Sequence, residues 1–231
     1  MDGAFAQAFL LIVGFDADFL GIVGLSLWVT LSAVAISAVI GLPLGALLAV
    51  CRFPGRGAVI VAVNALMGLP PVVAGLLVYL ALSRSGPAGF LGILFTPYAM
   101  IVAQTILVLP IVIALTRQVA EDMWAEYGDH LTSLGQTGGA AIGTLLYDGR
   151  FALAVTLLAG FGRAAAEVGA VMIVGGNIAG YTRTMTTAIA LETSKGDLAL
   201  ALGLGIVLLA LTLSINVVVF GASRLWHHQL R

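Results

Sequence analysis

The sequence predicts an all-α, polytopic membrane protein with five transmembrane helices. Of the 231 residues, 61% are hydrophobic and only 9% are charged, whereas about 25% of the residues of a soluble domain are charged. The mean hydropathy is +1.12. The apolar residues form long continuous runs instead of the alternating segments of a membrane β-barrel. These observations exclude a soluble enzyme and a disordered chain.

Five apolar runs are long enough to cross about 30 Å of hydrocarbon. They cover residues 20–50, 58–82, 97–116, 151–174 and 198–220. Residues 4–15 are too short to span and are predicted to form an interfacial helix. The chain therefore divides into an extracytoplasmic or interfacial segment 1–19, a transmembrane domain 20–220 and a cytoplasmic tail 221–231.

The distribution of Lys and Arg predicts the orientation in the cytoplasmic membrane. Six of these cations fall in the loops and tail of one side, and three fall in the loops of the other. The two groups are Arg52, Arg56, Arg117, Arg150, Arg224 and Arg231, and Arg84, Arg183 and Lys195. We expect the N-terminus outside and the C-terminus in the cytoplasm, which agrees with an odd number of spans.

The prolines of the second and third spans remove backbone donors and disturb a helix. Pro70 and Pro71 lie in the second span and Pro110 in the third. The freed carbonyls cannot face lipid, so they must face protein or a wet cavity. Broken helices around a cavity are typical of transporters, although each proline alone is equally explained by a packed kink. We predict two interrupted spans beside a pathway.

The fourth span contains Arg163 and Glu167, and an unpaired charge at that depth costs about 2.5–3.5 kcal/mol. Their i, i+4 spacing places both on one helix face, where they neutralise each other. The pair is interpreted as a structural pin to a neighbouring helix, as a moving part of the pathway or subunit interface, or as a proton relay. In the first span, Gly41 and Gly45 form a GxxxG match that weakly indicates a dimer face.

The cytoplasmic segment 117–150 is too long for a tight interhelical turn. Within it, residues 126–135 are predicted to form about two helical turns that end at Gly135. A short helix held there suits docking to a soluble partner, and a solvated loop is the alternative. His130 is not expected to bind a metal, because no second His or Cys is near.

A second polar stretch, residues 175–187, follows the fourth span on the outer side. It contains Asn177, Thr182, Arg183 and Thr184. Hydroxyl and guanidinium donors suit an oxyanion or a partner that delivers one, and an ordinary hydrophilic loop is the alternative.

Other chemistry is not indicated. With a net charge of −1 and one cysteine, Cys51, the chain offers neither a basic patch for nucleic acid nor a cysteine-rich metal site. The sequence has no G-x-x-x-x-G-K-[ST] phosphate loop. We therefore expect no metal or cofactor in this chain.

Three stretches resemble the membrane-spanning permease subunits of bacterial ABC importers, in particular the tungstate permeases and their molybdate and sulfate relatives. They are MGLPPVVAG at 67–75, QTILVLP at 104–110 and GFGRAAAEVGAVMIVGGNI at 160–178, the last continuing through TRTMTTAI at 182–189. The resemblance runs from about residue 25 to residue 220. It implies a type I ABC importer permease fold.

The resemblance also implies partners and candidate sites. In this family, two copies form the pathway, an extracytoplasmic substrate-binding protein delivers the substrate, and two ATPase subunits bind ATP and seat a coupling helix with an E-A-A-x-x-x-G motif. When Gly135 is aligned, Asp129, His130 and Leu131 stand where Glu, Ala and Ala are usual. The docking candidates are Glu126, Asp129, His130, Leu131 and Gly135; the pathway or gate candidates are Pro70, Pro71, Pro110, Arg163, Glu167, Asn177, Thr182, Arg183 and Thr184.

The resemblance makes the expected function the passage of an oxyanion, tungstate first, through a transport subunit that is not itself an enzyme. A molybdate or sulfate permease of the same type is the nearest alternative. A stand-alone secondary transporter or channel is a second, and an intramembrane enzyme that uses Glu167 and His130 is a third.

Overall fold

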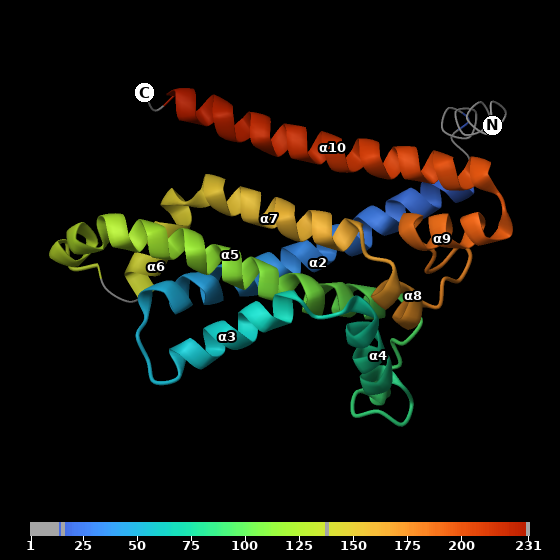
Figure 1. Cartoon of the computed structure of the whole chain (residues 1–231), viewed down its shortest axis with the longest axis horizontal. Helices are drawn as coiled ribbons and strands as arrows, with labels where there is room; N and C mark the ends of the chain where they lie inside the picture. The colour runs from blue at the N-terminus through green and yellow to red at the C-terminus, as the bar shows by residue number, and fades with distance from the viewer. Residues whose placement is uncertain (1–13, 15–16, 137–138, 230–231) are drawn as a thin grey trace. The chain divides into compact units, whose positions relative to one another are not determined.

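The computed structural model describes residue 14 and residues 17–136 and 139–229. The interfacial helix predicted at residues 4–15 therefore lies almost entirely outside the described residues. In chain order the helices are α2 (Ala17–Val50), α3 (Arg56–Met67), α4 (Pro71–Leu82), the 3₁₀ helix η1 (Gly89–Leu91), α5 (Pro97–Ser133), α6 (Gly139–Asp148), α7 (Arg150–Ala165), α8 (Gly169–Gly175), α9 (Met185–Lys195) and α10 (Leu198–Gln229) (Figure 1). Within the described ranges every regular element is helical, as the fold class predicts.

Three helices are long and apolar enough to cross a membrane: α2, α5 and the stretch Leu198–Val219 of α10. Two bent pairs, α3 with α4 and α6 with α7, bring the number of candidate spans to five if each pair is one span. The predicted number of five spans is therefore reached only if each bent pair counts as one span.

The chain packs as two compact units. Unit 1 comprises Met1–Ala33, Pro70–Gln104 and Gly162–Val217, and unit 2 comprises Val34–Leu69, Thr105–Phe161 and Val218–Arg231. The helices α2, α5, α7 and α10 contribute residues to both units.

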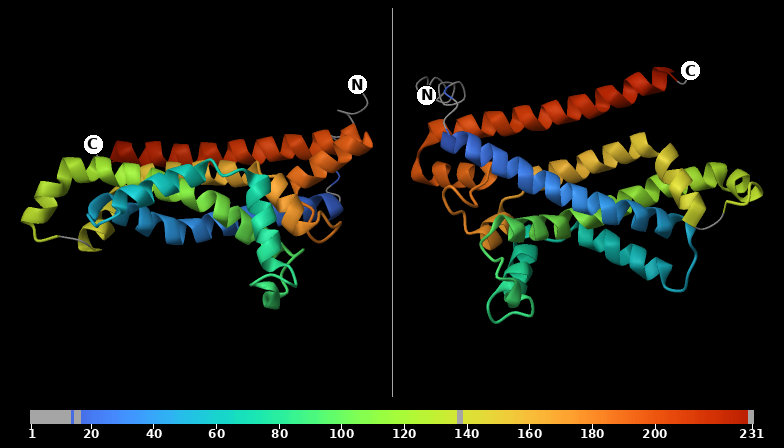
Figure 2. Two further views of the ribbon diagram at one scale, coloured as in Figure 1. Left: turned by 60° about the horizontal axis from the view of Figure 1, so that its bottom comes forward. Right: turned by 180° about the vertical axis from the view of Figure 1, so that it is seen from behind.

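In unit 1, α9 packs against the first half of α2 and the start of α10 (Figures 1 and 2). Phe19, Met185, Ala188 and Leu204 form the buried centre of this contact. The Ser26 hydroxyl accepts a hydrogen bond from the Met185 N–H at 2.7 Å, which satisfies one of the backbone donors that a helix start leaves unpaired. Apolar burial and one buried hydrogen bond thus fix α9 on α2.

Elsewhere in unit 1, α4 lies directly against α8 (Figure 1). A Cβ placed on Gly75 would lie only 2.7 Å from the Cα of Ala170. The backbones of the two helices therefore touch, which requires the small residues that the sequence provides here.

In unit 2, α2 packs tightly on α5 through two glycines. A Cβ on Gly45 would lie 2.6 Å from the Ile113 carbonyl oxygen, and one on Gly41 would lie 2.8 Å from a methyl group of Val112. The GxxxG pair is thus used inside one chain, so its assignment to a dimer face is wrong: the same small-residue surface serves either kind of helix contact.

The two proline sites behave differently. The helix stops at Met67 and restarts at Pro71, which confirms the predicted interruption at Pro70–Pro71. At Pro110 the prediction is wrong, because α5 continues without a break from Pro97 to Ser133. A single proline removes one backbone donor, and neighbouring helices re-satisfy the freed carbonyl. Two consecutive prolines remove two donors and end the helix.

The fourth predicted span also differs from the structure. The helix ends at Ala165, and a separate short helix begins at Gly169. Arg163 is in the last turn of α7, whereas Glu167 lies in the break.

Candidate functional site

The predicted docking segment is the end of a long helix rather than a separate short one. α5 continues past the apolar run to Ser133. Glu126, Asp129 and His130 are exposed on it, and Leu131 is half-buried. These four side chains are therefore held on a rigid element that extends from an apolar span.

Gly135 ends this helix as predicted. Its φ of +74° is left-handed, a conformation that favours glycine. The Gly135 N–H donates to the Thr132 carbonyl at 2.9 Å, and the Gln136 N–H donates to the Leu131 carbonyl at 2.8 Å. These two bonds form a Schellman motif. It leaves Leu134 76% exposed at the tip of the segment, where an apolar side chain is free to meet a partner.

Pro70 and Pro71 open α4. Pro70 occupies the N-cap with φ −61° and ψ 126°, and Pro71 is the first helical residue. Proline is favoured at this position because the helix start has no partner for its N–H. The carbonyl of Pro70 accepts a bond from the Ala74 N–H at 3.0 Å, so the restart is a regular helix end.

Arg163 and Glu167 form the predicted ion pair, with 2.7 Å between Arg163 Nη1 and Glu167 Oε2. The Glu167 side chain is only 3% exposed, whereas that of Arg163 is 29% exposed. The carboxylate is thus the buried partner, and the guanidinium neutralises it. A charge buried to this degree needs such a partner.

The second carboxylate oxygen of Glu167 holds the helix break. Oε1 accepts from the Ala170 N–H at 2.9 Å, in the first turn of α8. The Glu167 carbonyl accepts from the Thr186 hydroxyl at 2.8 Å, and the Ala164 carbonyl accepts from Gln104 Nε2 at 3.1 Å. These side chains satisfy backbone groups that a continuous helix would pair internally, which is why α7 stops where it does.

The polar stretch at residues 175–187 uses its threonine hydroxyl groups for hydrogen bonds within the protein. Thr182 is 1% exposed; its hydroxyl donates to the Gly175 carbonyl at 2.6 Å and accepts from the Ile178 N–H at 2.9 Å. Thr184 is the N-cap of α9, and its N–H donates to the Thr187 hydroxyl at 3.0 Å. These donors are committed to folding the loop.

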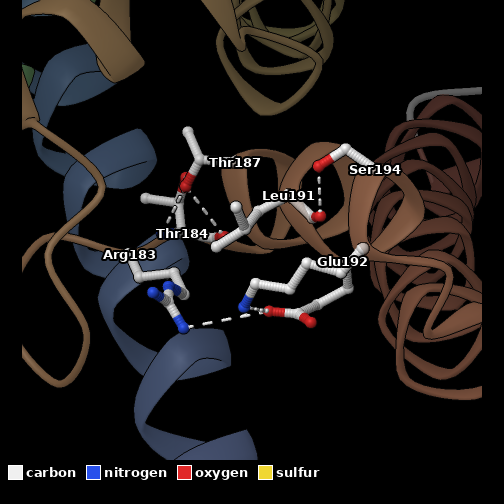
Figure 3. A network of polar contacts seen from close by, with 7 residues as sticks. Arg183, Thr184, Thr187, Leu191, Glu192 and Ser194 are labelled. Carbon is white, nitrogen blue, oxygen red and sulfur yellow. Dashed lines mark hydrogen bonds and ion pairs between the residues drawn. The ribbon is translucent and has the colours of Figure 1, made fainter.

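Arg183 and Asn177 complete this stretch. Figure 3 shows Arg183 directed at Glu192, with 4.0 Å between charged atoms, and Lys195 lies 2.9 Å from the same carboxylate. Asn177 has a φ of +50°, which asparagine tolerates better than most residues. The buried Glu192 carboxylate therefore lies near two cations, Arg183 just before α9 and Lys195 at its end.

A cavity of about 560 Å³ opens beside this network in unit 1. Its polar lining includes Asp18, Tyr181 and Arg183, and its apolar lining includes Ile22 and Leu25. In the described part of the chain, no three His, Cys, Asp or Glu side chains are grouped as a metal site would require.

One charged cluster was not anticipated. Glu121 binds both Arg117 and Arg56. The i, i+4 spacing of Arg117 and Glu121 is a usable signal for the first pair. Nothing in the sequence indicates the second pair, because Arg56 belongs to a different helix.

The described residues define a multi-pass helical membrane protein with interrupted spans and an exposed helical extension. No protein-family model matches the sequence. The protein named "Probable anion ABC transporter permease protein" from Haloferax volcanii is 41% identical over 182 residues, which are 77% of this chain and 78% of that protein. The tungstate uptake system permease protein TupB of Peptoclostridium acidaminophilum is 39% identical over 197 residues, 84% of this chain and 85% of TupB.

The chain therefore belongs to the ABC transporter permease family. It is a membrane-spanning transport subunit of an ABC transporter. The sulfate transport system permease protein CysW of Escherichia coli is more distant, at 28% identity over 183 residues, 76% of this chain and 63% of CysW.

Proposed function

We propose that this chain carries tungstate across the cytoplasmic membrane into the cell, driven by a separate ATPase. The observation that carries the proposal is the 39% identity to TupB, a tungstate uptake permease, over 85% of its length. Sulfate permeases are similar at only 28% identity and over a smaller share of their length. Molybdate or another oxyanion of the same shape is the nearest alternative substrate.

The paired charges of unit 1 suit passage of an anion rather than tight binding. Arg163 is neutralised by Glu167, and Arg183 faces Glu192. An anion that approached either guanidinium would have to compete with a carboxylate already in place. We infer that a separate extracytoplasmic binding protein selects the anion. In this proposal the break at Pro70–Pro71 and the Arg163–Glu167 break line the path.

We propose that the docking segment, residues 126–135, receives the ATPase on the cytoplasmic side. The segment ends a long helix, presents Glu126, Asp129 and His130 to solvent and exposes Leu134. A mix of exposed acidic groups and one apolar tip suits a cleft on a soluble partner. Two copies of the chain would then be driven between two states by partners that prefer different states.

Transport is tested in cells that lack other oxyanion importers. The chain is co-expressed with its ATPase and binding protein, and cellular tungsten is measured by mass spectrometry. We expect uptake that needs the ATPase and is not suppressed by excess sulfate. Suppression by sulfate would overturn the tungstate assignment, and uptake without the ATPase would favour a stand-alone transporter.

Docking is tested with bulky substitutions. Asp129→Trp combined with His130→Trp should abolish co-purification with the ATPase while the amount of inserted chain stays unchanged. Ser85→Trp, at another exposed turn, is the matched control and should co-purify normally. Wild-type recovery of the ATPase by the double variant would contradict the docking assignment.

Orientation is tested by cysteine labelling in intact cells. The native Cys51 is first replaced by alanine, and Ser133→Cys and Ser85→Cys are then introduced separately at exposed positions. A membrane-impermeant maleimide should label position 85 in intact cells and position 133 only after permeabilisation. The reverse pattern would overturn the proposed orientation.

A further inference from the structure

A cluster of three charged side chains joins α3 to α5 in unit 2, apart from the docking and pathway candidates. Glu121 on α5 contacts Arg56 at 2.5 Å and also pairs with Arg117, one turn earlier on α5. The three side chains are 20–33% exposed. They are partly shielded from water, so their attraction is screened less than that of a fully exposed pair.

Arg56 also binds the end of α2. Its Nε donates to the Leu48 carbonyl at 2.6 Å, one of the carbonyls that the last turn of a helix leaves without a partner. The negative end of the α2 dipole favours a cation at this place. Arg56, the first residue of α3, therefore holds three helices together: its own, α2 and α5.

The attachment of α3 contrasts with that of α2. The contacts of Gly41 and Gly45 bring the backbone of α2 against α5, so these two helices pack as one body. None of the residues of α3 is buried. Among the described residues, the side-chain hydrogen bonds from α3 to other helices are those of Arg56. The start of α3 is therefore fixed to α5 chiefly by charge.

We propose that the Arg56–Glu121–Arg117 cluster transmits movement of α5, which carries the docking segment, to α3. This inference rests on the proposed docking of an ATPase to α5. α3 leads directly to the break at Pro70–Pro71, so a displacement of its first turn reaches an interrupted span. The cluster residues position α3 and do not contact the transported anion.

The bonds within the cluster suit the transmission of movement from α5 to α3. Glu121 uses one oxygen for each arginine, so a shift of α5 moves a carboxylate that is bound to both helices. The planar guanidinium of Arg56 supplies both the bond to Leu48 and the bond to Glu121, which a lysine ammonium cannot do with the same geometry. Glu121→Gln removes the charge and keeps a side chain of nearly the same size.

The first experiment measures anion transported per ATP hydrolysed by the reconstituted complex. Glu121→Gln should lower this ratio by about two- to thirtyfold, the range found for changes within coupling networks. Co-purification of the ATPase should stay at the wild-type level. Asp122→Asn, an exposed neighbour on α5, is the matched control and should leave the ratio unchanged. An unchanged ratio in Glu121→Gln would overturn the inference.

A second measurement does not depend on transport. Hydrogen–deuterium exchange of the purified chain should speed up at residues 56–60 in Glu121→Gln and Arg56→Lys, but not in Asp122→Asn. Equal exchange in all variants would overturn the proposal that the cluster fixes the start of α3 to α5. A wild-type complex that neither binds the ATPase nor moves an anion would instead refute the proposed function, so the two failures are distinguishable.

Discussion

The two polar segments that interrupt the apolar sequence use their side chains in opposite ways. In residues 175–187, Thr182 and Thr184 are buried and their polar atoms bind the surrounding loop. In residues 126–135, Glu126, Asp129 and His130 are exposed on a helix. The buried threonines of the first segment bind their own loop, whereas the charged side chains of the second segment face solvent.

This difference shows why polarity in a sequence is a weak guide to binding. A threonine-rich stretch next to apolar spans has few neighbours except backbone, and buried hydroxyl groups pair with whatever backbone group is near. In the helical extension, Thr132 and Ser133 donate to carbonyls of their own helix, whereas the charged side chains of Glu126, Asp129 and His130 are exposed. Whether a side-chain donor is available to a binding partner thus depends on whether nearby backbone groups already bind it.

The largest expected effect concerns the buried charge of unit 1. Arg163→Gln leaves the Glu167 carboxylate without its cation and should lower the free energy of unfolding by about 3 kcal/mol, the lower end of the range for a broken buried pair. The double variant Arg163→Gln/Glu167→Gln should lose less, because no unpaired charge remains. Denaturation in mixed micelles measures both. An equal decrease in the free energy of unfolding of the two variants would mean that Arg163 does not stabilise the buried Glu167 carboxylate.

The next largest effect concerns the packing beneath the docking segment. Gly45→Ala forces a methyl group against the Ile113 carbonyl and should cost about 1–3 kcal/mol. Gly24→Ala, in the same helix with open space around it, should be neutral or gain up to about 1 kcal/mol. The same denaturation series compares the two. Unchanged stability of Gly45→Ala would argue against close packing of α2 on α5.

A matched pair of threonines tests the comparison directly. Thr182→Val removes a buried hydroxyl that makes two bonds and should cost about 1–3 kcal/mol. Thr132→Val, in the exposed docking segment, should change stability by less than about 0.5 kcal/mol. Thermal unfolding midpoints of the two variants should differ clearly. Similar unfolding midpoints would mean that the buried hydroxyl in residues 175–187 stabilises the protein no more than the exposed one in residues 126–135.

The smallest expected effect on stability is at the helix end. Gly135→Ala places a Cβ in the left-handed region and should cost about 1 kcal/mol, confined to the last turn. The yield of co-purified ATPase should fall clearly, because the tip of the docking segment is displaced. The unfolding midpoint should change only slightly. Gly143→Ala, in α6 with open space, is the control. A normal yield of complex from Gly135→Ala would show that the tip geometry is not needed.

Local chemistry made several features predictable. The break at Pro70–Pro71, the pairing of Arg163 with Glu167 and the helix end at Gly135 each depend on residues within about one helical turn. The prediction failed at Pro110, where α5 continues. One missing donor is not decisive, and the outcome depends on what packs around the freed carbonyl.

Features that join distant parts of the chain were not predictable. The use of Gly41 and Gly45 against α5 and the contact of Arg56 with Glu121 involve residues far apart in the sequence. The break at Glu167 is held by Thr186 and Gln104 from other helices. No spacing rule reports such pairs, because small residues and charges are compatible with several partners.

The sequence by itself determined that this protein is helical and apolar enough to cross a membrane several times. It did not determine the bounds of the fourth span, where one helix ends at Ala165 and another begins at Gly169. Lipid cannot hydrogen-bond the backbone, so a long apolar run must form a helix there. Only the tertiary structure decided which helices touch, which polar groups are buried and which remain open to a partner. Those outcomes depend on the packing of distant surfaces, and several packings satisfy the same apolar pattern.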